Sequence, residues 1–236
     1  MNINGLRLDN NGKLDIPAHI ENIKIDVGLS WCAPNSARWL FGEDKLFVIG
    51  VEPNDQAIKS IKDKGMVWHK TTEVVYNEDN YMLLECALDN VDELQMVDFY
   101  HMEGDPGTSS LMKPSPKLVK KQKIDFVKKV PVISLSDILE KIPWDRFEYI
   151  EHIKTDAQGK DLCVFMSAGD YIEKVVYLDV EVSTAGHYMN EINENHVVQI
   201  IKEKGFKVLK RGMNTTFLNT RYENIHKNIK HLIIGC

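Results

Sequence analysis

The sequence predicts an α/β fold built on a doubly wound, mostly parallel seven-stranded sheet with a C-terminal antiparallel hairpin. Short apolar runs alternate with segments whose apolar residues recur at helical spacing, for example at 46–51 and then at 55–64. Such alternation predicts a parallel sheet covered by helices on both faces. Residues 206–209 and 215–219 are strand-like and are separated by a connection of hairpin length, which predicts one antiparallel strand near the edge of the sheet.

The N-terminal half contains two strand-helix units after a polar lead-in at 1–22. The lead-in contains Asn10-Asn11-Gly12, a strong signal for a hairpin turn. The elements expected next are a strand at 23–27, a short helix at 37–41 capped by Asn35 or Ser36 and stopped by Gly42, a strand at 46–51, and a helix at 55–64 followed by Gly65.

A long polar segment at 104–129 interrupts this alternation and is rich in Gly, Pro, Ser and Lys. We predict a loop or lid here, because structureless segments of this length in compact domains are commonly functional or mobile. A solvated loop and an anion-binding lid are both open interpretations of its lysines. The other elements expected are strands at 81–88, 96–101, 130–133, 149–155 and 175–182, and helices at 136–141, 162–166 and 191–204, the first opened by a capping box of Ser134 and Asp137.

Composition and charge limit the classes of function. With 236 residues and 43% hydrophobic content, residues 1–236 are predicted to form a single domain around one core. The formal net charge of -6 argues against binding to nucleic acid or to an anionic membrane, because both need a basic face. The cysteines lack metal-ligand spacing, and the chain starts with neither a basic segment nor an apolar run, so a cytoplasmic protein is expected.

Two strand ends carry the residues expected to bind a cofactor. The strand at 23–27 includes Asp26 and leads into Gly28, and the strand at 46–51 is followed by Glu52 and, two positions later, by Asn54. In doubly wound folds such a glycine lets the backbone approach the ligand, and an acid after the second strand accepts hydrogen bonds from ribose hydroxyls. The pattern therefore predicts a ribose-bearing cofactor; an ordinary turn at Gly28 and a solvated acid at Glu52 are the alternatives.

The same turn distinguishes between cofactors. A dinucleotide site places its pyrophosphate at a helix start and needs three closely set glycines. Here Gly28 is followed by a loop that contains Cys32 and Pro34 instead of further glycines. A nicotinamide-dependent oxidoreductase is therefore the weaker alternative, and the sequence also lacks the Gly-Lys-Ser/Thr run of a phosphate-loop NTPase.

A series of motifs follows in order between residues 23 and 222: Ile25-Asp26-Val27-Gly28, Gly50-Val51-Glu52-Pro53-Asn54, Cys86-Ala87-Leu88-Asp89, Gly107-Thr108-Ser109-Ser110-Leu111, 130–139, Ile153-Lys154-Thr155-Asp156-Ala157-Gln158-Gly159, Leu178-Asp179-Val180-Glu181 and Thr216-Phe217-Leu218-Asn219. Their order and spacing resemble the FkbM family of S-adenosylmethionine-dependent methyltransferases. The chain departs from the family at Cys32, where a second glycine is usual, and at Gln158, where a glutamate is common.

The resemblance implies a Rossmann-like methyltransferase fold with S-adenosylmethionine as the cofactor. It also implies contacts of the cofactor with residues of the first three motifs. The methionine part is expected at Gly28 and its neighbour Asp26, the ribose at Glu52 with Asn54 beside it, and the adenine edge at Ala87, Leu88 and Asp89.

Methyl transfer to oxygen requires in-line alignment of two reactants and removal of the hydroxyl proton. The candidate catalytic residues lie at or beyond strand ends that face the cofactor crevice: Asp156, Glu181 and His187. Ser109 and Ser110 are candidate substrate-binding residues, with a flexible turn as the alternative. A divalent metal held by Asp156 and Glu181 is a further alternative, although the sequence contains no ligand cluster that indicates it.

The predicted function is S-adenosylmethionine-dependent O-methyl transfer to a hydroxyl of a small-molecule or glycan acceptor. The acceptor class is implied by the resemblance alone. A catalytically idle module that binds S-adenosylmethionine is the second hypothesis, motivated by Cys32 and Gln158. The sequence does not indicate an oligomeric state.

Overall fold

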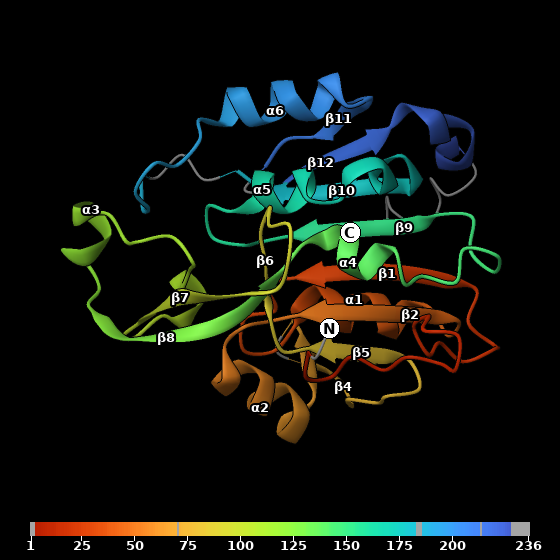
Figure 1. Ribbon diagram of the computed structural model, residues 1–236, viewed down its shortest axis with the longest axis horizontal. Helices are drawn as coiled ribbons and strands as arrows, with labels where there is room; N and C mark the ends of the chain where they lie inside the picture. Colours follow the sequence, from red (N-terminus) through yellow and green to blue (C-terminus); the bar gives the residue numbers. More distant parts are fainter. Residues whose placement is uncertain (1–2, 70, 183–185, 213, 228–236) are drawn as a thin grey trace.

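The computed structural model describes residues 3–69, 71–182, 186–212 and 214–227. Its centre is a seven-stranded sheet of order β11-β12-β10-β9-β1-β2-β5 (Figure 1). These strands are β1 (Asn22–Val27), β2 (Leu46–Val51), β5 (Tyr81–Leu84), β9 (Ile150–Thr155), β10 (Val175–Glu181), β11 (Phe206–Lys210) and β12 (Asn214–Asn219). β12 runs antiparallel to both of its neighbours, and the remaining neighbours pair in parallel. The predicted sheet and its C-terminal hairpin are confirmed.

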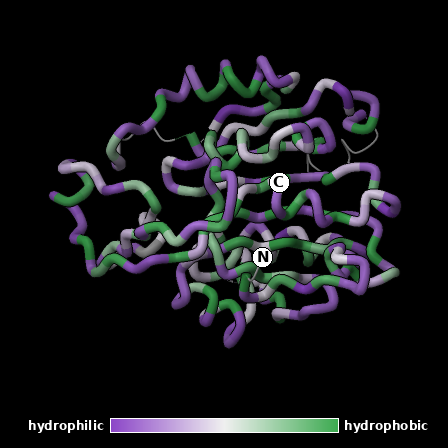
Figure 2. Tube along the Cα trace, viewed as in Figure 1, coloured by the Kyte–Doolittle hydropathy of each residue, from purple (hydrophilic) through white to green (hydrophobic). Residues whose placement is uncertain are grey.

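Helices cover both faces of the central sheet because its strands are apolar on both sides. In β2, Phe47 and Ile49 pack in the core beneath α4, α5 and α6, whereas Leu46 and Val48 pack in the core beneath α1 and α2. This alternation follows from the two-residue repeat of side-chain direction along a strand. Figure 2 shows the mixed apolar and polar character of the covering helices. The helices are α1 (Pro34–Gly42), α2 (Asp55–Lys64), α3 (Pro116–Val119), α4 (Leu135–Leu139), α5 (Asp161–Met166) and α6 (Glu194–Glu203).

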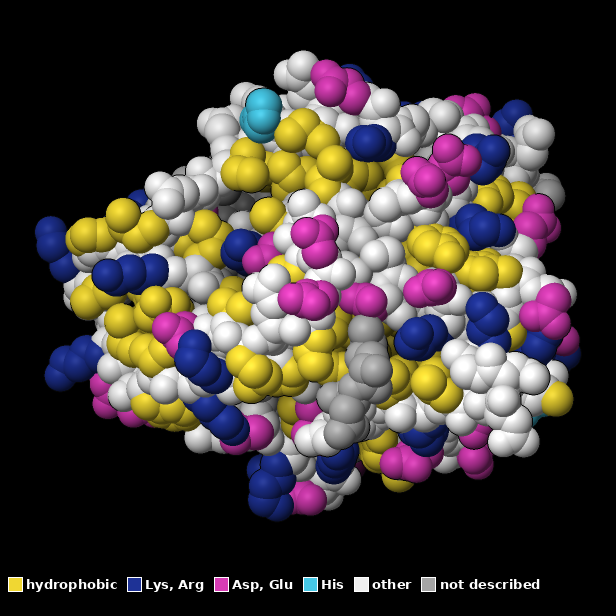
Figure 3. Space-filling model, in the orientation of Figure 1, with side chains coloured by type: hydrophobic (Ala, Val, Ile, Leu, Met, Phe, Trp, Pro, Cys, Tyr) yellow, Lys and Arg dark blue, Asp and Glu magenta, His cyan; other side chains and the backbone are white. Residues whose placement is uncertain are grey.

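Two smaller sheets accompany the central one. β3 (Met66–Trp68) and β4 (Thr72–Val74) form an antiparallel pair, while β6 (Ala87–Leu88), β8 (Ile124–Ile133) and β7 (Gln95–Met102) form a three-stranded sheet in that order. The β7–β8 hairpin and α3 extend to the left in Figure 1, and Figure 3 shows dark blue lysine side chains along this part of the surface. Among the described residues, no helix has the length and apolar character that crossing a bilayer requires.

The expectation of one strand at 81–88 is wrong. β5 ends at Leu84, the backbone N–H of Glu85 donates to the carbonyl of Asn4 at 3.0 Å, and the chain then leaves the central sheet. Ala87 and Leu88 instead pair in parallel with β8. The apolar pattern of 81–88 could not show that its two halves belong to different sheets, because both halves are buried.

The expectation of an irregular segment throughout 104–129 is also wrong. A single 3-10 turn (Pro106–Thr108) and α3 lie within it, and its last residues belong to β8, which pairs antiparallel with β7. Lys128 and Lys129 are on this strand and form ion pairs with Asp55 and Asp98, respectively. The sequence analysis missed this strand because its lysines resemble a solvated loop and their acidic partners are distant in the sequence.

Helix starts were predicted with mixed success. The capping box is confirmed: the Ser134 hydroxyl accepts from the N–H of Asp137, and the Asp137 carboxylate accepts from the N–H of Ser134. The expected cap of α1 at Asn35 or Ser36 is wrong, because α1 starts after Ala33 with Pro34 at its first position. Proline suits that position because its fixed φ matches a helix and its missing N–H would have had no partner there.

Gly28 directly follows β1 and packs against the backbone of Asp156, which directly follows β9. Its φ is +76°, and a Cβ atom there would lie 2.0 Å from the carbonyl oxygen of Asp156. Gly12 has a similar φ of +73°, but a Cβ atom there would have no heavy atom within 4 Å. We expect Gly28→Ala to lower the free energy of unfolding by about 3 kcal/mol or more and Gly12→Ala by about 1 kcal/mol, since only Gly28 adds a steric clash to backbone strain. Urea denaturation measures both, and equal losses would contradict this account.

Candidate active site

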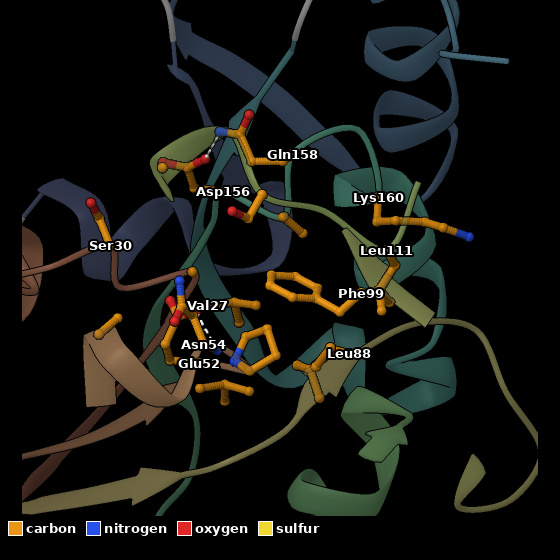
Figure 4. A pocket seen from close by; sticks show the side chains of 18 of the residues that line it. Val27, Ser30, Glu52, Asn54, Leu88, Phe99, Leu111, Asp156, Gln158 and Lys160 are labelled. Carbon is orange, nitrogen blue, oxygen red and sulfur yellow. Dashed lines mark hydrogen bonds between the residues drawn. The ribbon is translucent and has the colours of Figure 1, made fainter. Parts of the chain in front are cut away.

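A cavity lies at the carboxyl ends of β1, β2 and β9, and it encloses about 680 Å³ of empty space when the part open to solvent is counted. Figure 4 shows side chains from separate segments converging on it. Its lining includes Val27, Gly28, Ser30, Trp31, Val51, Glu52, Pro53, Asn54, Cys86, Ala87, Leu88, Phe99, Gly107, Ser109, Leu111, Asp156, Gln158 and Lys160. In doubly wound folds, ligands bind at this edge of the sheet.

Glu52 follows β2 and lies in the wall of the cavity, where it is almost fully buried. Its two carboxylate oxygens accept hydrogen bonds from the backbone N–H groups of Leu29, at 2.8 Å, and Asn54, at 2.9 Å. Burial raises the pKa of Glu52 to about 7, against the opposing effect of these hydrogen bonds. Asn54 also lines the cavity, and its side chain caps α2 by accepting from the N–H of Gln56.

Asp26 and Gly28 have different surroundings although they are close in sequence. Gly28 lines the cavity. Asp26 does not line it: its side chain is fully buried and accepts hydrogen bonds from the N–H and the hydroxyl of Ser36, at 3.1 and 2.6 Å. The structure therefore gives Asp26 the role of holding α1 against β1, rather than the cofactor contact that we expected.

In the segment after β5, two of the three residues predicted to contact adenine line the cavity, and the third does not. Ala87 and Leu88 line the cavity with apolar side chains, as expected for residues beside an adenine. Asp89 is outside the lining, and its carboxylate forms an ion pair with Lys160 at 2.7 Å. Lys160 is on the cavity wall, so Asp89 contributes to the site by engaging this cation.

Ser109 and Ser110 both anchor the segment that passes over the cavity. Ser109 lines the cavity, and its hydroxyl accepts from the N–H of Met102 at 3.1 Å. Ser110 is not in the lining; its hydroxyl donates to the carbonyl of Gln158 at 2.8 Å and accepts from the N–H of Met112 at 2.9 Å. Each hydroxyl thus holds backbone, which is compatible with a role in shaping the acceptor side of the site.

Asp156 and Glu181 lie close together beside the cavity, although they are 25 residues apart in the sequence. Gln158 bridges them: its side-chain nitrogen donates to Asp156 at 2.7 Å and to Glu181 at 2.9 Å. The two carboxyl groups also hydrogen-bond each other. Asp156 faces the cavity, whereas Glu181 borders a smaller neighbouring hollow next to α5 and α6.

This arrangement separates the pKa values of the two acids. Burial, together with the Asp156 charge, raises the pKa of Glu181 well above its ordinary value, to about 9. Burial would also raise the pKa of Asp156, but the Lys154 ammonium and the hydrogen bonds from Glu181 and Gln158 outweigh it, so the pKa of Asp156 is lowered. At neutral pH the pair therefore holds one proton, mainly on Glu181.

Lys154 is a central residue of the site that the sequence analysis did not select. It is buried in β9, and its ammonium donates to the carbonyl oxygens of Val27, at 3.2 Å, and Gly28, at 2.6 Å. The same ammonium lies 3.4 Å from Asp26 and 3.5 Å from Asp156. A lysine inside a strand buried on both faces was the available signal, since such lysines are rarely buried without partners.

His187 lies outside the lining of the cavity. Its N–H donates to Glu191 at 3.0 Å, and its carbonyl accepts from the N–H of Ser115 at 2.8 Å. These contacts tie the chain at 186–191 to the segment before α3. His187 thus lies next to the N-terminus of α3, and its catalytic role stays a prediction.

The described part of the cavity wall has more acidic than basic side chains. Glu52 and Asp156 line it, Glu181 contacts Asp156, and Lys160 is the cation among the described lining residues. Within the described ranges, no group of three or more His, Cys, Asp or Glu side chains is arranged to hold a metal ion. The alternative site of Asp156 with Glu181 is a bridged acid pair in this structure.

A comparison with protein families agrees with this geometry. The model of the Methyltransferase FkbM domain matches residues 15–208, which is most of the chain. The chain belongs to the FkbM methyltransferase family. A search of curated proteins finds no match. The resemblance inferred from the motifs is thus confirmed, and the FkbM chain is a methyltransferase by family.

The protonated state of Glu181 predicts a pH-dependent effect on stability in this FkbM protein. Its folded pKa is raised, so the stability it contributes is present below its ordinary pKa of 4.5 and is lost as the pH rises toward about 9. Glu181→Gln imitates the protonated side chain. We expect the change in the free energy of unfolding caused by Glu181→Gln to be more favourable at pH 8 than at pH 5, by on the order of 2 kcal/mol.

Urea denaturation at both pH values checks this prediction. Glu148→Gln is the matched control, because the Glu148 side chain is exposed to solvent. An equal effect of Glu181→Gln at pH 5 and pH 8 would show that Glu181 is ionised in the folded protein.

Proposed function

We propose that this FkbM-family protein uses S-adenosylmethionine to methylate a hydroxyl of a small-molecule or glycan acceptor. The observation that carries the proposal is the position of Glu52. Its buried carboxylate lies at the end of β2 in the wall of a cavity that also contains the backbone turn at Gly28. An acid in this position is suited to accept hydrogen bonds from the two hydroxyls of a ribose.

The lining of the cavity fits S-adenosylmethionine. Leu88, Phe99 and Ala87 supply apolar surface for a base. Glu52 is available to the ribose, and the turn at Gly28 exposes backbone to the amino-acid part. The acidic character of the wall favours a ligand with cationic groups, which S-adenosylmethionine has in its sulfonium and its ammonium.

The same wall fits a dinucleotide poorly. A pyrophosphate needs N–H donors at a helix start or cationic side chains. α1 begins with Pro34, which has no N–H, and the lining cation Lys160 is paired with Asp89. A pyrophosphate would also meet the carboxylates of Glu52 and Asp156. These features favour S-adenosylmethionine over NAD.

When bound, S-adenosylmethionine supplies an electrophilic methyl group. The residues of this chain then have to hold the acceptor hydroxyl in line and take up its proton. Asp156 is the best candidate for the proton acceptor, because its carboxylate faces the cavity and its pKa is lowered. A weak base is sufficient, since the acceptor oxygen becomes positively charged as its bond to the methyl group forms, which makes its proton strongly acidic.

Calorimetry with S-adenosylmethionine, S-adenosylhomocysteine and NAD tests the proposal. We expect the first two ligands to bind the intact protein and NAD not to bind. A mass-spectrometric screen of hydroxylated small molecules and glycans, with methyl-labelled S-adenosylmethionine, should then detect transfer to oxygen. Binding without transfer would favour the idle binding module, and failure of both S-adenosyl ligands to bind would reject the proposal.

A further inference from the structure

Gln158 is held in one orientation by contacts at both ends of its amide. Its side-chain nitrogen donates to Asp156 and Glu181, and its side-chain oxygen accepts from the Tyr188 hydroxyl at 2.7 Å. The ionised Asp156 carboxylate can only accept hydrogen bonds, so the amide nitrogen must face the acids and the amide oxygen must face the Tyr188 hydroxyl. The single proton of this hydroxyl is shared between Gln158 and the carbonyl of Thr108, which lies at 2.8 Å. Figure 4 shows the Gln158 side chain directed toward Asp156 at the cavity.

The backbone of Gln158 is also constrained. Its φ is +51°, in the left-handed region that side-chain-bearing residues seldom adopt, and its carbonyl accepts from the Ser110 hydroxyl. Such strain persists only where the surroundings enforce it, and it concentrates at functional sites. The segment over the cavity and the chain at 186–191 thus converge on Gln158, through Ser110 and Tyr188.

The charges around Asp156 define what the amide does. The charged and titratable groups that act on the acid pair are Lys154 on β9, Asp161 on α5 and Tyr188 in the chain at 186–191. Asp26 and Glu52 in turn act on Lys154, and Glu191 and Asp105 act on Tyr188. Most of these groups are acidic. An amide adds two donors to the pair and no charge, whereas a carboxylate at this position would add repulsion.

We propose that Gln158 is a positioning residue for methyl transfer: its amide holds Asp156 and Glu181 together as one unit, with the shared proton on Glu181 and the ionised Asp156 carboxylate facing the cofactor cavity. This inference rests on the proposed function. In the reaction, the bond between the methyl carbon and the sulfonium sulfur breaks, the bond to the acceptor oxygen forms, and the acceptor proton passes to Asp156. Gln158 keeps Asp156 ionised and directed at that proton.

The first experiment needs neither cofactor nor activity. The carboxyl carbons of aspartate and glutamate are labelled with ¹³C in the intact protein, the signals are assigned with Asp156→Asn and Glu181→Gln, and their shifts are followed against pH by NMR. We expect Gln158→Ala to move the titration of Asp156 upward by about one pH unit and Gln158→Glu to move it further. Tyr188→Phe, which keeps the ring and removes the donor to Gln158, should cause a smaller shift in the same direction.

The second experiment measures kcat at saturating S-adenosylmethionine against pH. In Gln158→Ala the acid limb of kcat should move upward with the NMR titration, while the affinity for S-adenosylhomocysteine stays within about threefold of the original, because Gln158 acts on the acid pair. Gln199→Glu is the control, since Gln199 is on α6 and its side-chain amide donates to Glu203 on the same helix. It should shift neither curve.

The two results separate this inference from the proposed function. The role of Gln158 would be overturned if no Gln158 variant moved the NMR titration of Asp156 or the acid limb of the kcat profile. This holds even if methyl transfer is observed. Absence of S-adenosylmethionine binding and methyl transfer in the original protein would overturn the proposed function and, with it, the catalytic role of Gln158. If the Asp156 titration still depended on Gln158 in that case, Gln158 would hold the two acids together for the stability of the fold and not for catalysis.

Discussion

Glu52→Gln is expected to weaken the binding of S-adenosylhomocysteine by about 100-fold or more, because two hydrogen bonds from ribose hydroxyls to a buried carboxylate are lost or impaired. Glutamine keeps the size of the side chain but has one accepting oxygen. Its NH₂ group would face either the N–H of Leu29 or the N–H of Asn54, which both donate to Glu52. Calorimetry at pH 8 measures the loss, and circular dichroism checks that the variant is folded.

A ligand-side control distinguishes loss of the ribose contact from a displaced loop. Removing the 2′ or 3′ hydroxyl of S-adenosylhomocysteine should weaken binding to the original protein, but it should have little further effect on Glu52→Gln, because the partner of the hydroxyl is already gone. If the deoxy ligands lose the same factor with both proteins, Glu52 does not contact the ribose.

Asp156→Asn is expected to reduce kcat by a factor of about 10² to 10⁴, the usual contribution of a positioned proton acceptor. Asparagine has nearly the same shape, but it cannot take up a proton at neutral pH, and its NH₂ group would face either the Gln158 amide or the Lys154 ammonium, which both face Asp156 oxygens. Cofactor binding should change by only a few fold, since Glu52 and the turn at Gly28 are unaltered. Steady-state kinetics and calorimetry measure the two effects separately.

The exposed Asp170→Asn is the matched control for this substitution, because Asp170 lies outside the cavity lining. It should leave kcat within about twofold of the original value. An Asp156→Asn variant that retained full kcat would show that another group, or water, accepts the proton.

The parts of the site that the sequence predicted are those that follow strands directly. Gly28 and Glu52 directly follow β1 and β2, and they were predicted at the cavity because the carboxyl ends of parallel strands meet at one edge of a sheet. Asp26 was predicted to contact the cofactor, but it lies within β1 and its side chain points toward Ser36 on α1 instead of the cavity. A position near a strand end does not fix where the side chain points.

The contacts that the sequence could not predict depend on strand order. Asp156 and Glu181 were selected separately, yet their pairing requires β9 and β10 to be neighbours in the sheet. Gln158 was noted only as a departure from the family motif, because its bridging role becomes visible once both acids and Tyr188 surround it. Lys154 was overlooked inside β9, which also contains Glu151 and His152.

The β7–β8 hairpin shows the same limit at the level of the fold. Its second strand is rich in lysine and alternates poorly, so local pattern favoured a loop. Pairing with β7 gives Lys129 a partner in Asp98, and it lets Phe99 reach the cavity wall. Long-range pairing decided the structure of this segment, and local propensity did not.

A crystal structure of the protein with S-adenosylhomocysteine tests the central claim most directly. We predict that the ligand occupies the cavity at the ends of β1, β2 and β9, with both ribose hydroxyls in hydrogen-bonding contact with the Glu52 carboxylate and the sulfur on the side of Asp156. A ligand bound elsewhere, or one bound in this cavity with its ribose away from Glu52, would contradict the account.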